Sequence, residues 1–164
     1  MLKNFFNKNG KKIENVFSPL QGTVVPLSSV PDSAFAEKMI GDGIAVIPKD
    51  GKVVSPVKGQ IIQVFPTKHA IGIKSEKGLE LLIHVGLDTV ELNGEGFDPY
   101  VTDGQTVNIG DPLLTVDLEY LKNHDKNVIC PIIITNMEQI SNIDQSNFSE
   151  INHGDLLLKC LIRG

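Results

Sequence analysis

Two histidines, His69 and His84, lie in mainly apolar stretches of the sequence, FPTKHAIGI and GLELLIHVGL. A neutral imidazole offers one nitrogen as a nucleophile, base or metal ligand while a partner holds the other nitrogen. Three chemistries are therefore open to the pair: phosphoryl transfer through a histidine, a two-histidine metal site, and general acid-base catalysis. For either residue taken alone, the alternative is a structural histidine packed in the core.

The segments around the two histidines have the alternating pattern of β-strands, and the sequence KSEKGL between them is typical of a hairpin turn. Pairing Lys74 with Leu79 across this turn places His69 opposite His84. Side chains opposite each other on neighbouring strands are close enough to share a hydrogen bond or a ligand. The sequence therefore predicts that the two histidines form one site.

The composition indicates a single β-rich domain without a nucleic-acid partner. The chain has 164 residues, of which 41% are hydrophobic, and its 15 Lys and Arg against 20 Asp and Glu give a net charge of −5. That balance lacks the basic face of a nucleic-acid-binding protein. Short β-branched runs separated by Gly, Pro, Asn and Asp predict an all-β sandwich or barrel. Only two short segments, 32–40 and 118–124, have a helical pattern.

Internal similarity indicates that this β fold is duplicated. FSPLQGTVVPL (17–27) resembles VSPVKGQIIQVF (54–65), and VNIGDPLLTVDL (107–118) resembles INHGDLLLKCLI (151–162). Repeats only two deep favour a duplicated sandwich or barrel over a solenoid. No linker divides the chain, so we expect a flexible N-terminal tail over residues 1–15 and one domain over 16–164.

Several familiar sites are missing from the sequence. It has no GxxxxGK[ST] loop, no GxSxG and no HExxH, so any phosphoryl donor must be brought by a partner. Cys130 and Cys160 lie in apolar strings without the spacing of a metal or redox pair, which favours buried free thiols.

We expect a cytoplasmic protein, because no apolar run approaches the ~20 residues of a membrane-spanning helix and no signal peptide is present. The basic start of the chain contains Phe5 and Phe6, which would allow at most a peripheral membrane contact. A solvated tail is the favoured interpretation of this segment.

The string GLELLIHVGLDTVELNGEGF resembles the active-site signature of the glucose-family enzyme IIA components of the bacterial phosphoenolpyruvate-dependent sugar phosphotransferase system. The resemblance continues in family order through PDSAFAEKMIGDGIAV, VVSPVKGQIIQVFPTKHAIGI, VTDGQTVNIGDPLLTVDL and PIIITNME. It spans nearly the whole chain from Val16 and is closer to a free-standing IIA protein than to a fused permease. The resemblance implies a compact fold of the duplicated hybrid motif type and a phosphotransferase relay rather than an ATP-dependent kinase.

The resemblance also implies roles for individual residues. His84 corresponds to the histidine that receives phosphate on Nε2 from the phosphocarrier protein HPr and passes it to a cysteine of the IIB domain of a glucose-type sugar permease. His69 corresponds to a second histidine that stabilises the phosphate, and Thr67 to the hydroxyl that orients His69. Asp32 and Asp88 match acidic residues near the pocket. The apolar rim on which partners dock corresponds to Phe35, Met39, Ile40, Phe65 and Leu82.

The resemblance implies no required cofactor. A zinc site formed by His69 and His84 with ligands from a partner remains as a secondary property. An alternative function is a regulatory binding module, whose docking to transporters or metabolic enzymes is switched by histidine phosphorylation.

Overall fold

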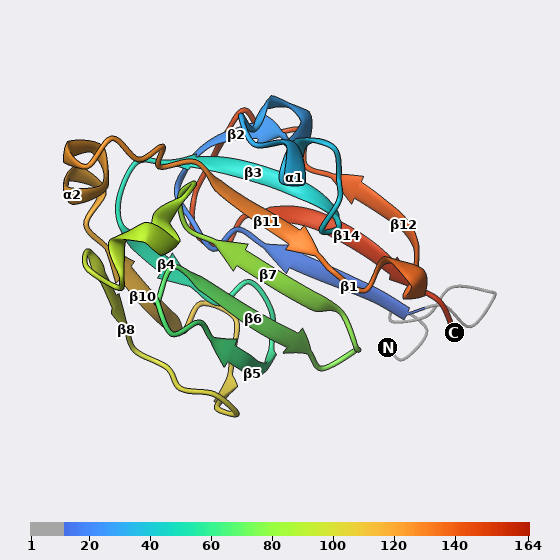
Figure 1. Ribbon diagram of the computed structural model, residues 1–164. Coiled ribbons are helices and arrows are strands. Elements are labelled where there is room, and N and C mark those ends of the chain that lie inside the picture. The colour runs from blue at the N-terminus through green and yellow to red at the C-terminus, as the bar shows by residue number, and fades with distance from the viewer. Residues whose placement is uncertain (1–11) are drawn as a thin grey trace.

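Residues 12–164, which the computed structural model describes, form three antiparallel sheets with a few short helices (Figure 1). The largest sheet has eight strands in the order β13-β2-β3-β11-β7-β6-β5-β9. These strands are β13 (Glu150–Ile151), β2 (Gly22–Pro26), β3 (Asp42–Pro48), β11 (Cys130–Ile134), β7 (Glu80–His84), β6 (Ala70–Ser75), β5 (Gly59–Val64) and β9 (Thr106–Val107). The expected all-β architecture is confirmed.

Two three-stranded sheets complete the β structure. One has the order β1-β14-β12, with β1 (Lys12–Phe17), β14 (Leu156–Ile162) and β12 (Ile140–Gln145). The other has the order β4-β10-β8, with β4 (Lys52–Val54), β10 (Pro112–Val116) and β8 (Phe97–Pro99). The helical segments are η2 (Leu27–Ser29), α1 (Ser33–Ala36), η3 (Thr89–Leu92), α2 (Leu118–Asn123) and η4 (Met137–Gln139).

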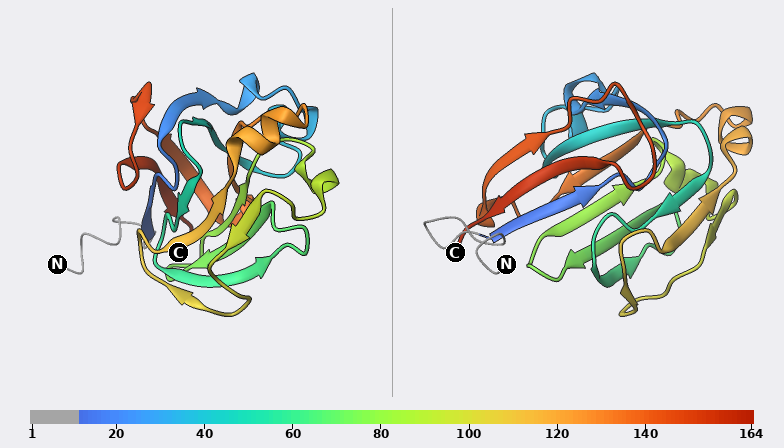
Figure 2. Two further views of the ribbon diagram at one scale, coloured as in Figure 1. Left: turned by 90° about the vertical axis from the view of Figure 1, so that its left-hand side faces the viewer. Right: turned by 180° about the vertical axis from the view of Figure 1, so that it is seen from behind.

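The three sheets enclose one main apolar core. β1 and β14 lie behind β7 and β11 in Figure 1 and face the viewer when the molecule is seen from behind in Figure 2. The core between these layers is built from Ile, Val and Leu, including the fully buried Leu81 and Ile83 of β7 and Leu157 and Leu158 of β14. Burying such side chains contributes roughly 1.5–3 kcal/mol each, so this core supplies the rigid support for the strands that carry the histidines.

The internal duplication predicted from the sequence is confirmed in atomic detail. The Ser18 hydroxyl donates to the carbonyl of Leu20 at 2.6 Å, and the Ser55 hydroxyl donates to the carbonyl of Val57 at 2.8 Å. Each serine is followed by a strand at the same place in its half of the eight-stranded sheet, β2 or β5.

The second pair of similar segments obeys the same symmetry. Asp111 and Asp155 close equivalent turns by accepting from the backbone amides of Asn108 and Asn152, at 2.8 and 2.9 Å. The backbone carbonyls of Asp111 and Asp155 in turn accept from the amides of Ser55 and Ser18. The two halves of the chain therefore repeat one local structure.

A second, smaller apolar cluster lies on the outer face of the large sheet, on the side away from the main core. Leu27, Val30 and Phe35, from η2, the loop after it and α1, pack over Ala45 of β3 and Ile133 of β11. Both faces of β3 and β11 are thereby covered. The cluster extends as far as Leu82 of β7, which is only partly buried.

Other expectations about the chain have mixed outcomes. Cys130 and Cys160 are buried free thiols, as predicted. Strand β1 begins at Lys12, inside the segment 1–15 proposed as a tail, and pairs with β14. Phe5 and Phe6 lie outside the described residues. Within residues 12–164, no helix has the length and apolar character needed to cross a bilayer.

Candidate active site at a histidine pair

The two histidines meet where β6 begins and β7 ends. Their rings lie edge to face, with centroids 4.9 Å apart and an interplanar angle of 79°. The backbone connects them as well, because the Val85 amide donates to the His69 carbonyl at 2.7 Å. The predicted hairpin and the predicted proximity of the two residues are both confirmed.

The predicted register of that hairpin is wrong by one residue. Lys74 pairs with Glu80 rather than with Leu79, and the residue opposite His84 is Ala70. The Ser75 amide donates to the Leu79 carbonyl, so the turn holds one more residue than the sequence suggested. His69 itself precedes the strand and follows Lys68, whose φ of 62° interrupts the extended backbone. The strand alternation therefore does not extend to His69.

One hydrogen bond defines the protonation of His84. Its Nδ1 lies 2.7 Å from the carbonyl oxygen of Gly86. A carbonyl oxygen only accepts, so Nδ1 carries the proton and donates it. In the neutral ring the lone pair available to a reactant is therefore on Nε2.

Gly86 shapes the loop that supplies this carbonyl. Its φ is 78°, and a Cβ at this position would lie 2.6 Å from the Thr89 side chain and 3.0 Å from the Asn127 carbonyl oxygen. Glycine is the residue that adopts this conformation without steric cost. The fully buried Thr89 hydroxyl donates to the Val85 carbonyl at 2.7 Å and fixes the loop from below. The sequence signature contained both residues, but their positioning roles were not predicted.

His69 is held through its Nδ1 as well. The Thr67 hydroxyl lies 2.7 Å from this atom. When the hydroxyl donates to Nδ1, the proton of the neutral His69 ring is on Nε2, where it can be donated to an anion. The pair then presents one nucleophilic nitrogen, His84 Nε2, and one hydrogen-bond donor, His69 Nε2.

Both rings are neutral near pH 7. Burial, together with a smaller effect of the neighbouring His84, lowers the pKa of His69 to about 4. Burial also lowers the pKa of His84, although the Gly86 carbonyl, Asp32 and Asp88 act in the opposite direction. Desolvation disfavours the charged imidazolium, so the lone pair needed for nucleophilic attack is present at neutral pH.

Two aromatic rings support the histidines. Phe35 lies edge-on to His84 with centroids 5.0 Å apart, and Phe65 lies edge-on to His69 at 5.7 Å. Phe35 is only 4% exposed. Its expected place on the exposed rim is therefore wrong, because α1 turns this ring inward against the outer cluster and His84.

The two aspartates lie close enough to influence the pKa of His84. Asp32 is the N-cap of α1, and its carboxylate accepts from the Ala34 amide at 3.0 Å. Asp88 is exposed and has a φ of 57° at the end of the loop after β7. These residues place negative charge near His84.

Exposed apolar side chains follow α1, whose Phe35 contacts His84. Met39 is 72% exposed and Ile40 is 39% exposed in the segment after α1, while Leu82 is partly buried. Val90, at 51% exposure in η3 just beyond Asp88, was not predicted. Exposed apolar residues gathered around a reactive group are typical of a protein-docking surface.

Within residues 12–164, His69 and His84 have no third His, Cys, Asp or Glu close enough to complete a metal site. A structural zinc ion takes four protein ligands, and a catalytic zinc ion usually takes three. The described part of this chain therefore does not by itself fit a zinc site.

Comparisons with known proteins place the chain among relatives of one kind. The chain is 50% identical over 147 residues to the "PTS system glucose-specific EIIA component" of Staphylococcus aureus (strain COL), which covers 88% of each chain. It is 46% identical over 157 residues to the protein of the same name from Staphylococcus epidermidis, covering 94% of this chain and 95% of the relative. The solved structure of glucose permease IIA from Mycoplasma capricolum matches with a TM-score of 0.85 and 41% identity, covering 90% of this chain and 96% of that one.

A family profile matches most of the chain and gives the residue range of the similarity. The profile described as phosphoenolpyruvate-dependent sugar phosphotransferase system, EIIA 1, matches residues 14–140, which include both histidines and the loops that hold them. The chain therefore belongs to the EIIA 1 family of the phosphoenolpyruvate-dependent sugar phosphotransferase system.

Proposed function

We propose that His84 Nε2 accepts a phosphoryl group from HPr and passes it to the IIB domain of a glucose-type sugar permease. The observation that carries this proposal is the hydrogen bond from His84 Nδ1 to the Gly86 carbonyl. It leaves the Nε2 lone pair facing reactants and keeps a proton acceptor in place for the ring after it gains a phosphoryl group.

The transfer balances without an added acid or base. The Nε2 lone pair forms a new P–N bond as the P–N bond of the donor histidine breaks, and the donor ring recovers its lone pair. The phosphorylated His84 ring then carries positive charge, which the Gly86 carbonyl stabilises through the Nδ1 proton. In the next step, the thiolate of the IIB cysteine attacks the same phosphorus, and His84 returns to its neutral form.

We assign His69 the role of a hydrogen-bond donor to the phosphoryl oxygens. Phosphoryl transfer proceeds through a loose transition state with charge spread over these oxygens, so alignment and a fixed donor supply most of the catalysis. His69 suits this role because its pKa of about 4 keeps the ring neutral. A neutral donor stabilises the transferred group without binding it as tightly as a cation would.

The partners proposed here are proteins rather than small molecules. Met39 and Ile40 would contact HPr and IIB beside the histidines, and closure of this contact would exclude water from a hydrolysable P–N bond. Such a relay would operate in the cytoplasm. A zinc ion at His69 and His84 would need further ligands from a partner, and no step of the transfer passes through it.

The exposed apolar surface around His84 also favours a second function. Regulatory proteins or transporters would dock on the same surface, and a phosphoryl group on His84 would place negative charge at its centre. The two functions are distinguished by the fate of the phosphoryl group. In a relay it leaves promptly for IIB, whereas in a pure switch it persists until it is hydrolysed.

Labelling of His84 tests the proposal. The protein is incubated with labelled phosphoenolpyruvate, enzyme I and HPr, and the modified residue is mapped. We expect an acid-labile, base-stable phosphate that is lost in His84→Ala and retained in His124→Ala, a control at an exposed histidine. Full labelling of the folded His84→Ala variant would overturn the assignment.

A further inference from the structure

The outer cover of the large sheet ends at β7. Residues of η2 and α1 cover β3 and β11, and their cluster reaches only to Leu82. Beyond it, the outer faces of β6, β5 and β9 carry exposed side chains, among them Ile62, Lys74 and Thr106. Ala70, beside His84, is itself buried, so the open sheet face begins beyond it and continues across β6, β5 and β9.

The strand register divides this open face into rows of neighbours. The first row holds His84 beside Ala70. The second row holds Leu82 beside Gly72, and the bulged residue Ile62 of β5 lies against Gly72.

The third row is polar. Lys74 lies between Glu80 of β7 and Gln60 of β5, and Gln60 pairs with Thr106 of β9. The apolar surface next to the active site is thus bordered by a polar strip with Lys74 near its centre.

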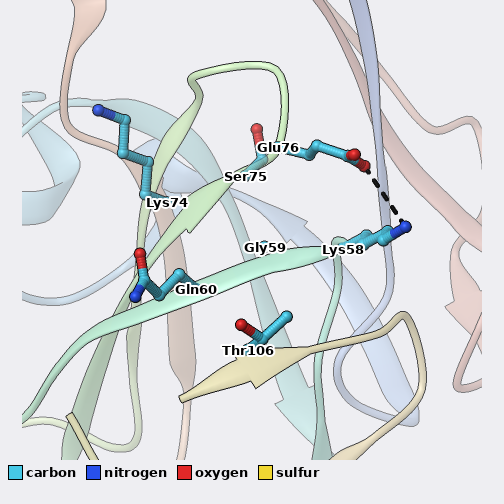
Figure 3. A pocket seen from close by; sticks show the side chains of 7 residues that line it. All are labelled: Lys58, Gly59, Gln60, Lys74, Ser75, Glu76 and Thr106. Atoms are coloured by element: carbon cyan, nitrogen blue, oxygen red, sulfur yellow. Dashed lines mark ion pairs between the residues drawn. The ribbon is translucent and has the colours of Figure 1, made fainter. Parts of the chain in front are cut away.

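The polar strip contains a shallow hollow of about 320 Å³, shown in Figure 3. Lys74 and Gln60 extend from neighbouring strands at one end, and Thr106 lies on the next strand. At the other end, Lys58 pairs with Glu76 at 3.8 Å, and both side chains are mostly exposed. Lys74 makes no ion pair with any residue that the structure describes.

The strip lies within reach of any protein that docks on His84. Lys74 is four residues along β6 from Ala70, the neighbour of His84, so the row is about 13 Å away at 3.3 Å per residue. A standard protein interface buries about 800 Å² on each partner, which corresponds to a disc of about 16 Å radius. A partner centred on His84 therefore covers Lys74 at its rim.

We propose that this strip is a second recognition element of the docking surface, and that the phosphoryl-transfer partner places a carboxylate beside Lys74. This inference rests on the proposed function, because it assumes a protein docked on His84. The occupant is defined by its chemistry: a protein surface with an acidic side chain about 13 Å from its own reactive residue.

The charge of Lys74 is the reason for specifying a carboxylate. A partner that covers the ammonium removes part of its hydration, which costs free energy unless an opposite charge replaces the lost water. Glu80, opposite Lys74 on β7, is half-buried and does not pair with it, and Glu76 pairs with Lys58, so we expect the compensating charge to come from the partner. Asp32 and Asp88 place the opposite charge close to His84, and this separation of charges would favour one orientation of the partner.

Charge reversal at Lys74 tests the inference. Initial rates of phosphoryl transfer from HPr and to IIB are measured against partner concentration for wild type, Lys74→Gln and Lys74→Glu, at low and high salt. We expect Lys74→Glu to raise the half-saturating concentration of at least one partner by about three- to tenfold at low salt, with Lys74→Gln in between. The maximal rate should not change, and the effect should shrink at high salt.

The control is Lys159→Glu, which makes the same charge change at an exposed lysine of β14 in another sheet. The inference would be overturned if Lys74→Glu and Lys159→Glu had the same half-saturating concentrations for both partners. In that case the proposed function stands as long as wild type still transfers phosphate through His84. If wild type accepts no phosphate from HPr, the proposed function itself fails. A change confined to one partner identifies the protein that carries the carboxylate.

Discussion

Phe35 lies edge-on to His84, with ring centroids 5.0 Å apart and an interplanar angle of 60°. Phe35 comes from the single helical turn α1, whereas His84 ends a strand of the large sheet. The contact joins the outer apolar cluster to the reactive ring. The orientation of His84 therefore depends on η2 and α1 as well as on its own hairpin.

Replacing Phe35 with leucine should slow phosphorylation of His84 more than it destabilises the fold. Leucine keeps the position apolar, so we expect a loss of about 1–2 kcal/mol in the free energy of unfolding. Without the aromatic edge, the His84 ring has more freedom, and the rate should fall several-fold. Denaturant unfolding and initial phosphorylation rates measure the two effects.

The control for Phe35 is Phe97→Leu, because Phe97 is similarly buried (6% exposed) but lies in the main core on β8. It should lose comparable stability and keep the wild-type rate. If the two variants slow phosphorylation equally, the Phe35 contact has no specific role.

Removing His69 or its hydrogen bond should slow transfer to different extents. His69→Ala loses the proposed donor to the phosphoryl oxygens, so onward transfer to IIB should fall about 10²-fold or more. Thr67→Val removes only the 2.7 Å contact to Nδ1, and the expected loss is about tenfold or less. Single-turnover transfer from phosphorylated protein measures both.

A control substitution at another threonine shows whether the slower transfer comes from the lost hydrogen bond to His69 or from any Thr→Val change. Thr115→Val removes an exposed hydroxyl of β10 that bonds to the Tyr100 hydroxyl, in a different sheet from the histidines. It should transfer at the wild-type rate. Wild-type kinetics in Thr67→Val as well would show that His69 needs no orienting partner.

The sequence predicted the elements of the site better than its exact geometry. The predicted hairpin was enough to bring His69 and His84 together although the predicted alternation does not reach His69, and the Ser-Pro and Gly-Asp repeats were enough to predict the duplication. The register was missed by one residue because it depends on how the turn from Ser75 to Leu79 closes. A hydrophobicity pattern does not distinguish neighbouring registers when the turn length is uncertain.

The burial of Phe35 and the polar strip at Lys74 needed the structure for a related reason. Phe35 belongs to a helix of four residues, too short for a periodic pattern to define its buried face. The alignment of Lys74 with Gln60 and Thr106 depends on pairings between strands that are distant in sequence, including a bulge at Ile62. Local sequence carries little information about either feature.

The stability of the fold should decrease as the pH falls from about 6.5 towards 4. The pKa of His69 is about 4 in the folded protein, against 6.5 for an unperturbed histidine, so the unfolded chain binds more protons in this range. By linkage, a group with a depressed folded pKa stabilises the protein above its unfolded pKa and loses that contribution as the pH falls. His69 alone should account for about 2 kcal/mol between about pH 7.5 and about pH 5.

Carboxylates also titrate near pH 5, so the contribution of His69 is measured as the difference in acid-induced loss of stability between wild type and a His69 variant. Wild type and His69→Gln are unfolded by denaturant at both pH values. His69→Gln should lose less stability on acidification, by about the amount assigned to His69. Equal losses in the two proteins would show that His69 is not held neutral by burial.

The contribution of Glu14 to stability should depend on pH in the opposite direction to that of His69. It is 8% exposed on β1, and burial raises its pKa although Ser75 and Lys77 act against the shift. The carboxylate is therefore less favourable in the folded protein than in the unfolded chain. Stability from this group is full at low pH and decreases as the pH rises above the unfolded pKa.

Glu14→Gln should accordingly match or exceed the stability of wild type near pH 7. Its advantage should disappear at about pH 4, where the wild-type carboxyl is largely protonated. Thermal melting at both pH values measures the difference. A clear loss of stability at pH 7 would show that the ion pair with Lys77, 3.7 Å away, outweighs desolvation.

Ile40→Glu should disrupt docking without disrupting the fold. Ile40, shortly after the helix that contacts His84, is 39% exposed, so a carboxylate there is solvated in the free protein. In a complex it would replace an apolar contact and repel the incoming phosphoryl group. Losing a central apolar anchor typically costs about 2 kcal/mol, or roughly thirtyfold in affinity. The half-saturating concentration of HPr should rise by about this factor.

The control for Ile40 is a residue of nearly equal exposure. Leu156, the first residue of β14, is 40% exposed, and Leu156→Glu introduces the same charge on a different sheet from the one that carries the histidines. Both variants should melt near the wild-type temperature, because neither side chain is in the core. Only Ile40→Glu should need more HPr to reach half the maximal rate. A folded Ile40→Glu protein that accepts phosphate from HPr with wild-type kinetics would mean that Ile40 lies outside the contact, and that the partner approaches His84 from the side of η3 and Val90 instead.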